Sequence, residues 1–185
     1  MGNKTVDCVS KCIGYAAVRE WTPSPRSGER ILDLKPYTQI NSFSCGVAAG
    51  FSVVKSFYPT ARFEDFYDRV DPDEEMGTPT VVLRKALRKS RISIKSPRLS
   101  YQALLGHIRE GHPVIVVIRN PGADYLHWVV AYGFGRNHII LASKGVPWLH
   151  QKRVPRKDFM TMWEPRGNGI VCGGESRRRR LPFRC

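Results

Sequence analysis

The stretch Gln39-Ile-Asn-Ser-Phe-Ser-Cys45-Gly46 leads directly into Val47-Ala-Ala-Gly-Phe-Ser-Val-Val-Lys-Ser-Phe57, a run of small and apolar residues. This run is typical of a buried helix, so the sequence predicts a helix that begins at Cys45 and ends before Pro59. The partial positive charge at a helix start favours a thiolate, and we therefore expect a lowered pKa for Cys45. The stretch indicates a cysteine nucleophile.

A second informative segment lies far downstream, where the run from His127 to Gly133 is typical of a buried strand. An imidazole beside a thiol accepts the thiol proton and later returns it to the leaving group, which makes His127 a candidate general base and acid. The side-chain amide of Gln39 and the backbone N–H of Cys45 are candidates to bind a developing oxyanion.

The predicted elements come in the order helices first, strands afterwards. Helical patterns cover residues 45–57, 62–70, 79–90 and 101–109, strand patterns cover 92–94, 113–118, 127–134, 138–142 and 151–154, and a short helix follows at 156–163. A turn at 135–137 between two apolar runs predicts an antiparallel hairpin. The fold class is therefore α+β, with an N-terminal helical part packed on a C-terminal antiparallel sheet.

The chain length of 185 residues suits one domain with tails. We expect a peripheral segment over residues 1–30, where a Pro- and Ser-rich loop precedes the compact region, and a domain over 31–164. Gly and Arg dominate residues 165–185, which predicts a flexible basic tail.

The net charge of +14 predicts attraction to acidic partners, and the run Arg177–Arg180 is its densest part. No aromatic platform or Gly-rich phosphate loop accompanies these arginines, so we expect non-specific contacts rather than sequence-specific nucleic-acid recognition. A binder of nucleic acid or acidic surfaces is kept as one alternative function.

Five cysteines, an odd number, argue against a complete disulfide framework and favour a reducing compartment. The histidines are placed on a helix (His107), in a turn (His112) and at strand positions (His138, His150), and no pair has metal-ligand spacing; we expect no metal and no cofactor. There is no clear signal peptide and no apolar run of about 18 residues. These features predict a cytoplasmic protein without a membrane span, and delivery as a secreted effector stays open.

The order of motifs resembles the papain-like cysteine peptidases, most closely the double-glycine leader peptidases associated with bacteriocin export. The resemblance covers residues 37–163 and rests on five segments in the same order: Gln39 to Gly46 with the Ala-rich helix after it, Gly77 to Leu87, Leu105 to Val116, His127 to Val130, and Asp158 to Trp163. It implies a papain-like fold and a thiol protease that cleaves a peptide or protein substrate, with Cys45 as nucleophile, His127 as base and Gln39 as oxyanion donor.

One position departs from that family. Its members place Asp or Asn at the end of the strand that follows the histidine strand, and here Ser143 occupies the place. A serine hydroxyl accepts a hydrogen bond from the imidazole but carries no charge to stabilise an imidazolium. Asn137 and Asp124 are possible substitutes, although chain order places neither well.

Two further functions therefore stay open beside a peptidase that uses Cys45, His127, Gln39 and Ser143. A weak or inactive papain-like domain would hold a peptide in its cleft, and an acyl transferase or transamidase would pass the acyl group to an amine. The dipeptide Gly173-Gly174 adds the hypothesis of self-processing, because the relatives cut after two glycines and exposed tails are where cleavage concentrates.

Overall fold

The computed structural model describes residues 23–119, 125–142, 153–163, 168–174 and 180–184. Its helices are α1 (Cys45–Phe57), α2 (Phe63–Val70), α3 (Thr80–Lys89), α4 (Tyr101–Arg109) and α5 (Arg156–Met162). Its strands are β1 (Arg30–Ile31), β2 (Ser93–Lys95), β3 (Val114–Arg119), β4 (Leu126–Phe134), β5 (His138–Ala142), β6 (Arg153–Pro155) and β7 (Gly169–Gly173).

All the strands belong to one antiparallel sheet, in the order β2-β7-β3-β4-β5-β6, with β1 paired to β4. The long central pair is β3 and β4, which runs from Val114 opposite Ala131 to Arg119 opposite Leu126. Between β4 and β5 the register shifts at Ala131 and Gly133. The predicted α+β class, with an antiparallel sheet after the main helices, is confirmed.

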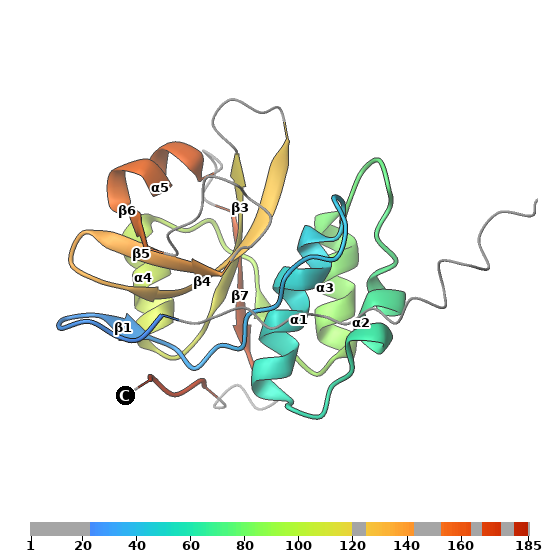
Figure 1. Cartoon of the computed structure of the whole chain (residues 1–185), viewed down its shortest axis with the longest axis horizontal. Helices are drawn as coiled ribbons and strands as arrows, with labels where there is room; N and C mark the ends of the chain where they lie inside the picture. Colours follow the sequence, from blue (N-terminus) through green and yellow to red (C-terminus); the bar gives the residue numbers. More distant parts are fainter. Residues whose placement is uncertain (1–22, 120–124, 143–152, 164–167, 175–179, 185) are drawn as a thin grey trace, which may run out of the picture.

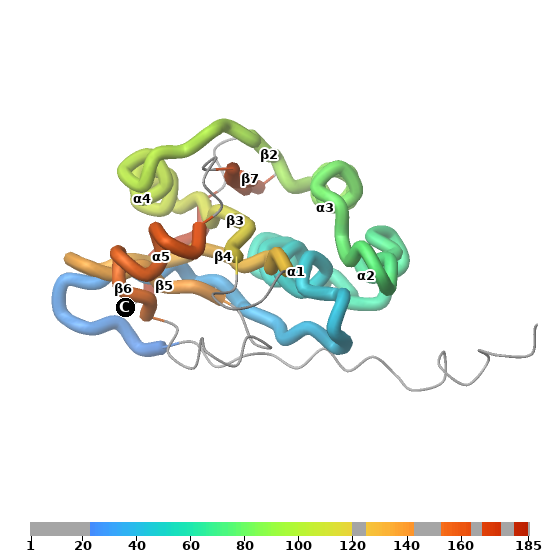
Figure 2. The backbone as a smooth tube through the Cα atoms, turned by 90° about the horizontal axis from the view of Figure 1, so that it is seen from above, coloured from blue at the N-terminus to red at the C-terminus, as the bar shows by residue number. Residues whose placement is uncertain are grey.

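The helices divide between the two sides of the sheet. Helices α1, α2 and α3 pack on one another as a group, and α1 lies against β4 (Figure 1). Helices α4 and α5 lie on the opposite side and contact each other through the rings of Tyr101 and Phe159, 6.1 Å apart (Figure 2). The sheet is therefore covered on both sides, which explains why β3 is an apolar run rather than an alternating one.

Helix α1 is central because its sequence lacks a polar face. Every residue from Gly46 to Val54 is buried, and such a helix needs neighbours on all sides. Its small residues permit close contacts: a Cβ on Gly46 would lie 2.5 Å from Thr78 Cβ. The hydroxyl of Ser52 accepts a hydrogen bond of 2.9 Å from the Tyr37 backbone N–H, and this bond holds the segment before Cys45 along the helix.

The prediction of a flexible tail from residue 165 is wrong for the described residues. Residues 169–173 form β7, a buried inner strand between β2 and β3, and residues 180–184 run beside β1. The run Ile170-Val171-Cys172, with a glycine on each side, is a short strand that the neighbouring Gly and Arg residues obscured. The self-processing hypothesis depends on an exposed Gly173-Gly174 dipeptide. In the structure Gly173 pairs with Ser93 and Gly174 is buried, so the dipeptide is not exposed.

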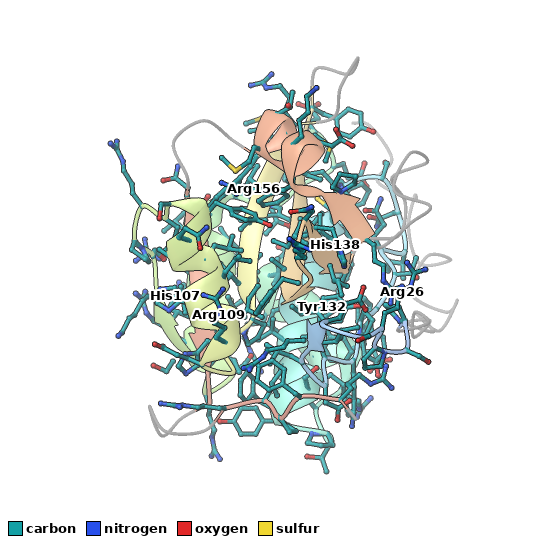
Figure 3. All side chains as sticks on the ribbon, turned by 90° about the vertical axis from the view of Figure 1, so that its left-hand side faces the viewer. Arg26, His107, Arg109, Tyr132, His138 and Arg156 are labelled. Atoms are coloured by element: carbon teal, nitrogen blue, oxygen red, sulfur yellow. The ribbon has the colours of Figure 1, made fainter. Side chains whose placement is uncertain are left out.

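The N-terminal boundary also differs from the predicted one. Glu29, in the segment predicted to be peripheral, accepts hydrogen bonds from Arg153 Nε (2.6 Å) and Arg153 Nη2 (2.8 Å), and its side chain is 3% exposed. His138 Nε2 lies 2.7 Å from the same carboxylate (Figure 3 labels His138). Within the described part of the chain, no helix has the length and apolar character needed to cross a membrane.

Candidate active site

The loop before α1 is fixed by its own hydrogen bonds. Ser44 is fully buried, and its hydroxyl accepts from the backbone N–H of Ile40 (3.2 Å) and of Asn41 (3.4 Å). The Asn41 side-chain amide donates to the Tyr67 hydroxyl of α2 at 3.1 Å. Ser44 therefore holds the loop together instead of capping the helix, and Cys45 follows it as the first residue of α1.

Strand β4 brings His127 to the same place. His127 lies opposite Ile118 of β3, is 6% exposed, and is the second residue of β4. The backbone N–H of the next residue, Trp128, points to the sulfur of Cys45, as do the N–H groups of Gly46 and of Cys45 itself. The start of α1 and the start of β4 thus meet at the thiol, although their residues are about 80 positions apart.

A cleft of about 690 Å³ opens at this meeting point. Gln39, Cys45 and His127 all line it, and the same three residues also line a small hollow behind it, together with Trp128. The remaining lining comes from the α2–α3 loop and from the neighbouring ends of β3 and β4: Glu74, Glu75, Met76, Gly77, Thr78, Pro79, Thr80, Val117, Tyr125 and Leu126, with Ser42 and Phe43. The three residues selected from the sequence therefore share one cleft.

Burial governs the ionisation of both candidate catalytic groups. It raises the pKa of the Cys45 thiol, and the N–H groups that point to the sulfur offset the rise only in part. The prediction of a lowered thiol pKa is therefore wrong, because desolvation outweighs the helix start. Burial also lowers the pKa of His127 to about 4. At neutral pH the cleft therefore contains a thiol and an uncharged imidazole, and these are the forms from which general-base catalysis starts.

Gln39 is held with one side of its amide turned inward. Its Nε2 donates to the Asn41 backbone oxygen at 3.0 Å, which leaves the second N–H of the amide for another acceptor. Its Oε1 is buried and has no hydrogen-bond partner among the described residues. The amide is thus anchored beside Cys45 with donor capacity to spare.

The fourth predicted site residue, Ser143, lies outside the described residues, directly after the end of β5 at Ala142. Asp124 lies outside them as well. Asn137 is in the turn between β4 and β5, and β4 separates it from His127 by roughly 20 Å at about 3.3 Å per residue. Asn137 therefore does not reach the imidazole. The other candidate substitute, Asp124, lies outside the described residues.

An ordered turn forms one wall of the cleft. Asp73 and Gly77 exchange two backbone hydrogen bonds of 2.9 Å, and the Asp73 carboxylate accepts from the backbone N–H of Glu75 (2.9 Å) and of Met76 (2.6 Å). These bonds lower the pKa of Asp73. The turn holds Glu74, Glu75 and Met76 at the cleft, and the Met76 side chain is 79% exposed.

Sequence reasoning missed the contact that joins this wall to the sheet. Trp128 Nε1 donates a hydrogen bond of 2.9 Å to the backbone oxygen of Thr78. Thr78 is buried, and a side chain on Gly46 would collide with it. The available signal was the glycine directly after Cys45, because a glycine that opens a helix marks a close approach of another segment.

Comparison with known proteins gives a consistent picture. The pattern that defines the Peptidase C39 family matches residues 33–172. No curated protein matches the chain.

Several solved structures share the fold. One is the peptidase domain of Streptococcus ComA, described as a bi-functional ABC transporter involved in a quorum-sensing pathway; the identity is 21%, the match covers 78% of this chain and 97% of that one, and the TM-score is 0.61. A double glycine motif protease from an AMS/PCAT transporter, in complex with a leader peptide, matches at 17% identity over 78% and 96% of the chains, with a TM-score of 0.60. A putative C39-like peptidase from Bacillus anthracis matches at 12% identity over 77% and 96%, with a TM-score of 0.59.

Proposed function

Because the chain belongs to the Peptidase C39 family, we propose that it is a cysteine peptidase that hydrolyses peptide bonds through an acyl-enzyme intermediate. The observation that carries the proposal is the shared cleft of Cys45, His127 and Gln39. This arrangement supplies a nucleophile, a base and an oxyanion donor, which together are sufficient for acyl transfer without a metal or organic cofactor.

The proposed reaction begins when His127 accepts the thiol proton as the Cys45 sulfur attacks a peptide carbonyl carbon. The new C–S bond leaves an oxyanion, which the Gln39 amide and the Cys45 backbone N–H stabilise. When the C–N bond breaks, His127 gives its proton to the departing amine and a thioester remains. Water then attacks the thioester, His127 takes a proton from it, and release of the acid restores the thiol.

A third residue normally orients the imidazole in such sites. We propose Ser143 for this role, because it follows the last residue of β5, the neighbour of the strand that carries His127. Its hydroxyl would accept a hydrogen bond from the ring without adding charge. Such a dyad with a neutral helper is expected to be slower than one with a carboxylate.

The substrate we propose is an extended peptide, as in the related protease bound to a leader peptide. Glu74 and Glu75 line the cleft, and no Lys or Arg does so among the described residues, although the chain has 30 Lys and Arg against 16 Asp and Glu. Met76, Tyr125 and Leu126 add exposed apolar surface there. The cleft therefore favours peptides with a basic residue and an apolar residue near the scissile bond.

A peptide-binding domain without catalysis is the second candidate, since burial raises the pKa of Cys45 and so reduces its thiolate fraction. A thiol-reactive peptide probe separates the two functions. For a peptidase, Cys45 is labelled faster than any other thiol, and His127→Ala slows this labelling by about 10²–10⁴-fold, the usual contribution of a general base. Labelling that is equally fast in His127→Ala contradicts the peptidase. Amide products formed in the presence of added amines would identify a transamidase of the same fold.

A further inference from the structure

A second cluster of chemically active side chains lies at the end of α4, and it shares no lining residue with the catalytic cleft. His107, Glu110 and His112 each present one potential ligand atom, and these atoms all lie within 4.8 Å of one another. The Glu110 carboxylate oxygen Oε2 is 3.9 Å from His107 Nδ1 and 3.8 Å from His112 Nδ1. Figure 3 shows His107 on α4, on the side of the molecule away from Arg26.

The backbone, rather than chance side-chain rotation, brings the two histidines together. Helix α4 ends at Arg109 with Glu110 as its C-cap residue, and Gly111 follows with φ +84°, a left-handed conformation that glycine adopts readily. The Gly111 N–H bonds to the Ile108 oxygen and the His112 N–H bonds to the His107 oxygen, both at 3.0 Å. This pair of bonds is the Schellman motif, whose geometry places the side chains of the first and last residues side by side.

The cluster borders a pocket of about 80 Å³. The rest of the pocket is lined by residues of β2 and β7: Ser93, Lys95, Val171, Cys172 and Gly173. The His107 and His112 side chains are 26% and 16% exposed, so both rings are largely buried, whereas the Glu110 side chain is 59% exposed. Two largely buried imidazoles and one exposed carboxylate thus gather around a small opening.

We propose that His107, Glu110 and His112 bind a divalent transition-metal ion, with Zn²⁺ as the best match. Imidazole nitrogen and carboxylate oxygen suit Zn²⁺ and its neighbours in the series better than Mg²⁺ or Ca²⁺, which prefer oxygen alone. Metal–ligand bonds of about 2.0–2.2 Å in a tetrahedron require ligand atoms about 3.3 Å apart. The carboxylate would therefore approach each ring by a fraction of an ångström, and the two ring nitrogens, which lie within 4.8 Å of each other, would also move closer together.

The positive charges around the cluster affect both the pKa of His112 and the binding of a metal ion. Lys95 lines the pocket, and Arg180 packs on Gly111, where a Cβ would lie 2.7 Å from the Arg180 Cβ. Burial and the charge of Arg180 lower the pKa of His112, with smaller contributions from His107 and Lys95, while Glu110 opposes them. The same two cations repel a metal ion, and we expect moderate affinity that rises when Lys95 is neutralised.

The test is a titration of Zn²⁺ and Co²⁺ into the full chain carrying Cys45→Ala, followed by calorimetry and by the visible spectrum of bound Co²⁺. The Cys45→Ala background removes the catalytic thiol, so the result does not depend on the proposed peptidase activity. Adding His107→Ala and His112→Ala should weaken binding by at least about 100-fold, since loss of even an outer-shell partner costs about 10–100-fold. Unchanged affinity in this double variant overturns the proposal.

Two further variants keep the test decisive if the double variant folds poorly. Glu110→Gln removes a ligand at an exposed position and should weaken Zn²⁺ binding at least tenfold, whereas Glu64→Gln, a matched change on α2, should leave it unchanged. Lys95→Gln should tighten binding, because it removes a repelling charge. Equal affinity in Glu110→Gln and Glu64→Gln, weaker binding in Lys95→Gln, or a Co²⁺ spectrum dominated by thiolate charge transfer would each contradict the assignment.

Discussion

The indole N–H of Trp128 donates a hydrogen bond of 2.9 Å to the backbone oxygen of Thr78, and this bond joins the strand side of the cleft to the helical side. Trp128 also directs its backbone N–H to the sulfur of Cys45. One residue therefore fixes the distance between the cleft walls and contacts the nucleophile, while its neighbour His127 supplies the base.

The variant Trp128→Phe keeps an aromatic ring and removes the indole donor. The Thr78 oxygen then loses its partner, which should lower the free energy of unfolding by about 1–2 kcal/mol. The value of kcat/KM for a peptide substrate should fall by more than the loss of folded protein accounts for, because the cleft walls are no longer joined. Urea denaturation and steady-state kinetics measure the two effects; an unchanged kcat/KM would argue against a role for this bond in shaping the cleft.

The variant Gly46→Ala tests the close approach of α1 to Thr78. Alanine is the better helix former, but its Cβ would lie 2.5 Å from Thr78 Cβ, and overpacking typically costs about 1–3 kcal/mol. We therefore expect a lower melting temperature in spite of the helix propensity. Gly106→Ala on α4 is the matched control, since no atom lies within 4 Å of its Cβ position, and it should stabilise the protein slightly.

The pKa of His127 predicts a pH dependence of stability. The folded-state value of about 4 lies below the ordinary value of 6.5, so the unfolded chain binds a proton first as the pH falls. Stability is complete above about pH 6.5 and is lost between there and pH 4, by about 3 kcal/mol for this group. The free energy of unfolding of His127→Gln should fall less over this range than that of the wild type. Parallel pH curves for the two proteins would contradict the prediction.

The same pKa predicts the acid limb of the reaction. General-base catalysis requires the uncharged imidazole, so kcat/KM should stay level as the pH falls from 7 to 5 and decline only near pH 4. An ordinary exposed histidine would give a decline near pH 6.5. A kcat/KM profile with its midpoint there would show that the imidazole is solvated in the working enzyme.

The acidic turn predicts substrate preference. In Glu74→Lys with Glu75→Lys, peptides that carry Arg near the scissile bond should lose at least about tenfold in kcat/KM, while peptides with Glu at that position should gain. The effect should weaken at high salt, because both side chains are exposed. Charge reversal at Glu64 and Asp65 of α2, outside the cleft lining, is the control; an equal change there would indicate a general charge effect.

The ion cluster around Glu29 is expected to be structural. Glu29→Gln leaves Arg153 and His138 without their carboxylate, and losing hydrogen bonds to a charged group at such a partly buried position should cost about 1.5–3 kcal/mol. The loss should vanish only at strongly acidic pH, because Arg153 and its neighbours lower the pKa of Glu29 to about 2. Denaturation of the variant and wild type at pH 7 measures the difference, and a loss under 1 kcal/mol would contradict a stabilising role.

The spacing of apolar residues, together with the residues that end helices and strands, predicted most of the secondary structure. Helix α1 from Cys45, helix α4 from Tyr101 to Arg109 and strand β5 from His138 to Ala142 were predicted with the bounds that the structure shows. Each has an uninterrupted pattern with a clear stop: Pro59, Gly111, or the turn before His138. The pattern of β7 is only five residues long and contains two glycines, so its composition resembled a loop even though pairing with β2 and β3 makes it a strand.

The sequence also predicted which side chains share the cleft, since its motifs indicate Gln39, Cys45 and His127 as a catalytic group. It did not predict their ionisation, because the pKa values of Cys45 and His127 depend on burial by segments remote in the chain. The proximity of His107 to His112 was missed for another reason. The two are five residues apart, a spacing that separates them on a continuous helix and joins them only when Gly111 ends it.

The position of β7 has a consequence for biosynthesis. Strand β3, which supports the histidine strand, has one edge without a partner until residues 169–173 have left the ribosome, and β2 cannot join the sheet before then. Exposed strand edges invite association with other chains, so a nascent chain stalled near residue 165 is expected to aggregate or to require a chaperone. The middle of the sheet is thus closed by the last of its described strands to be synthesised, β7.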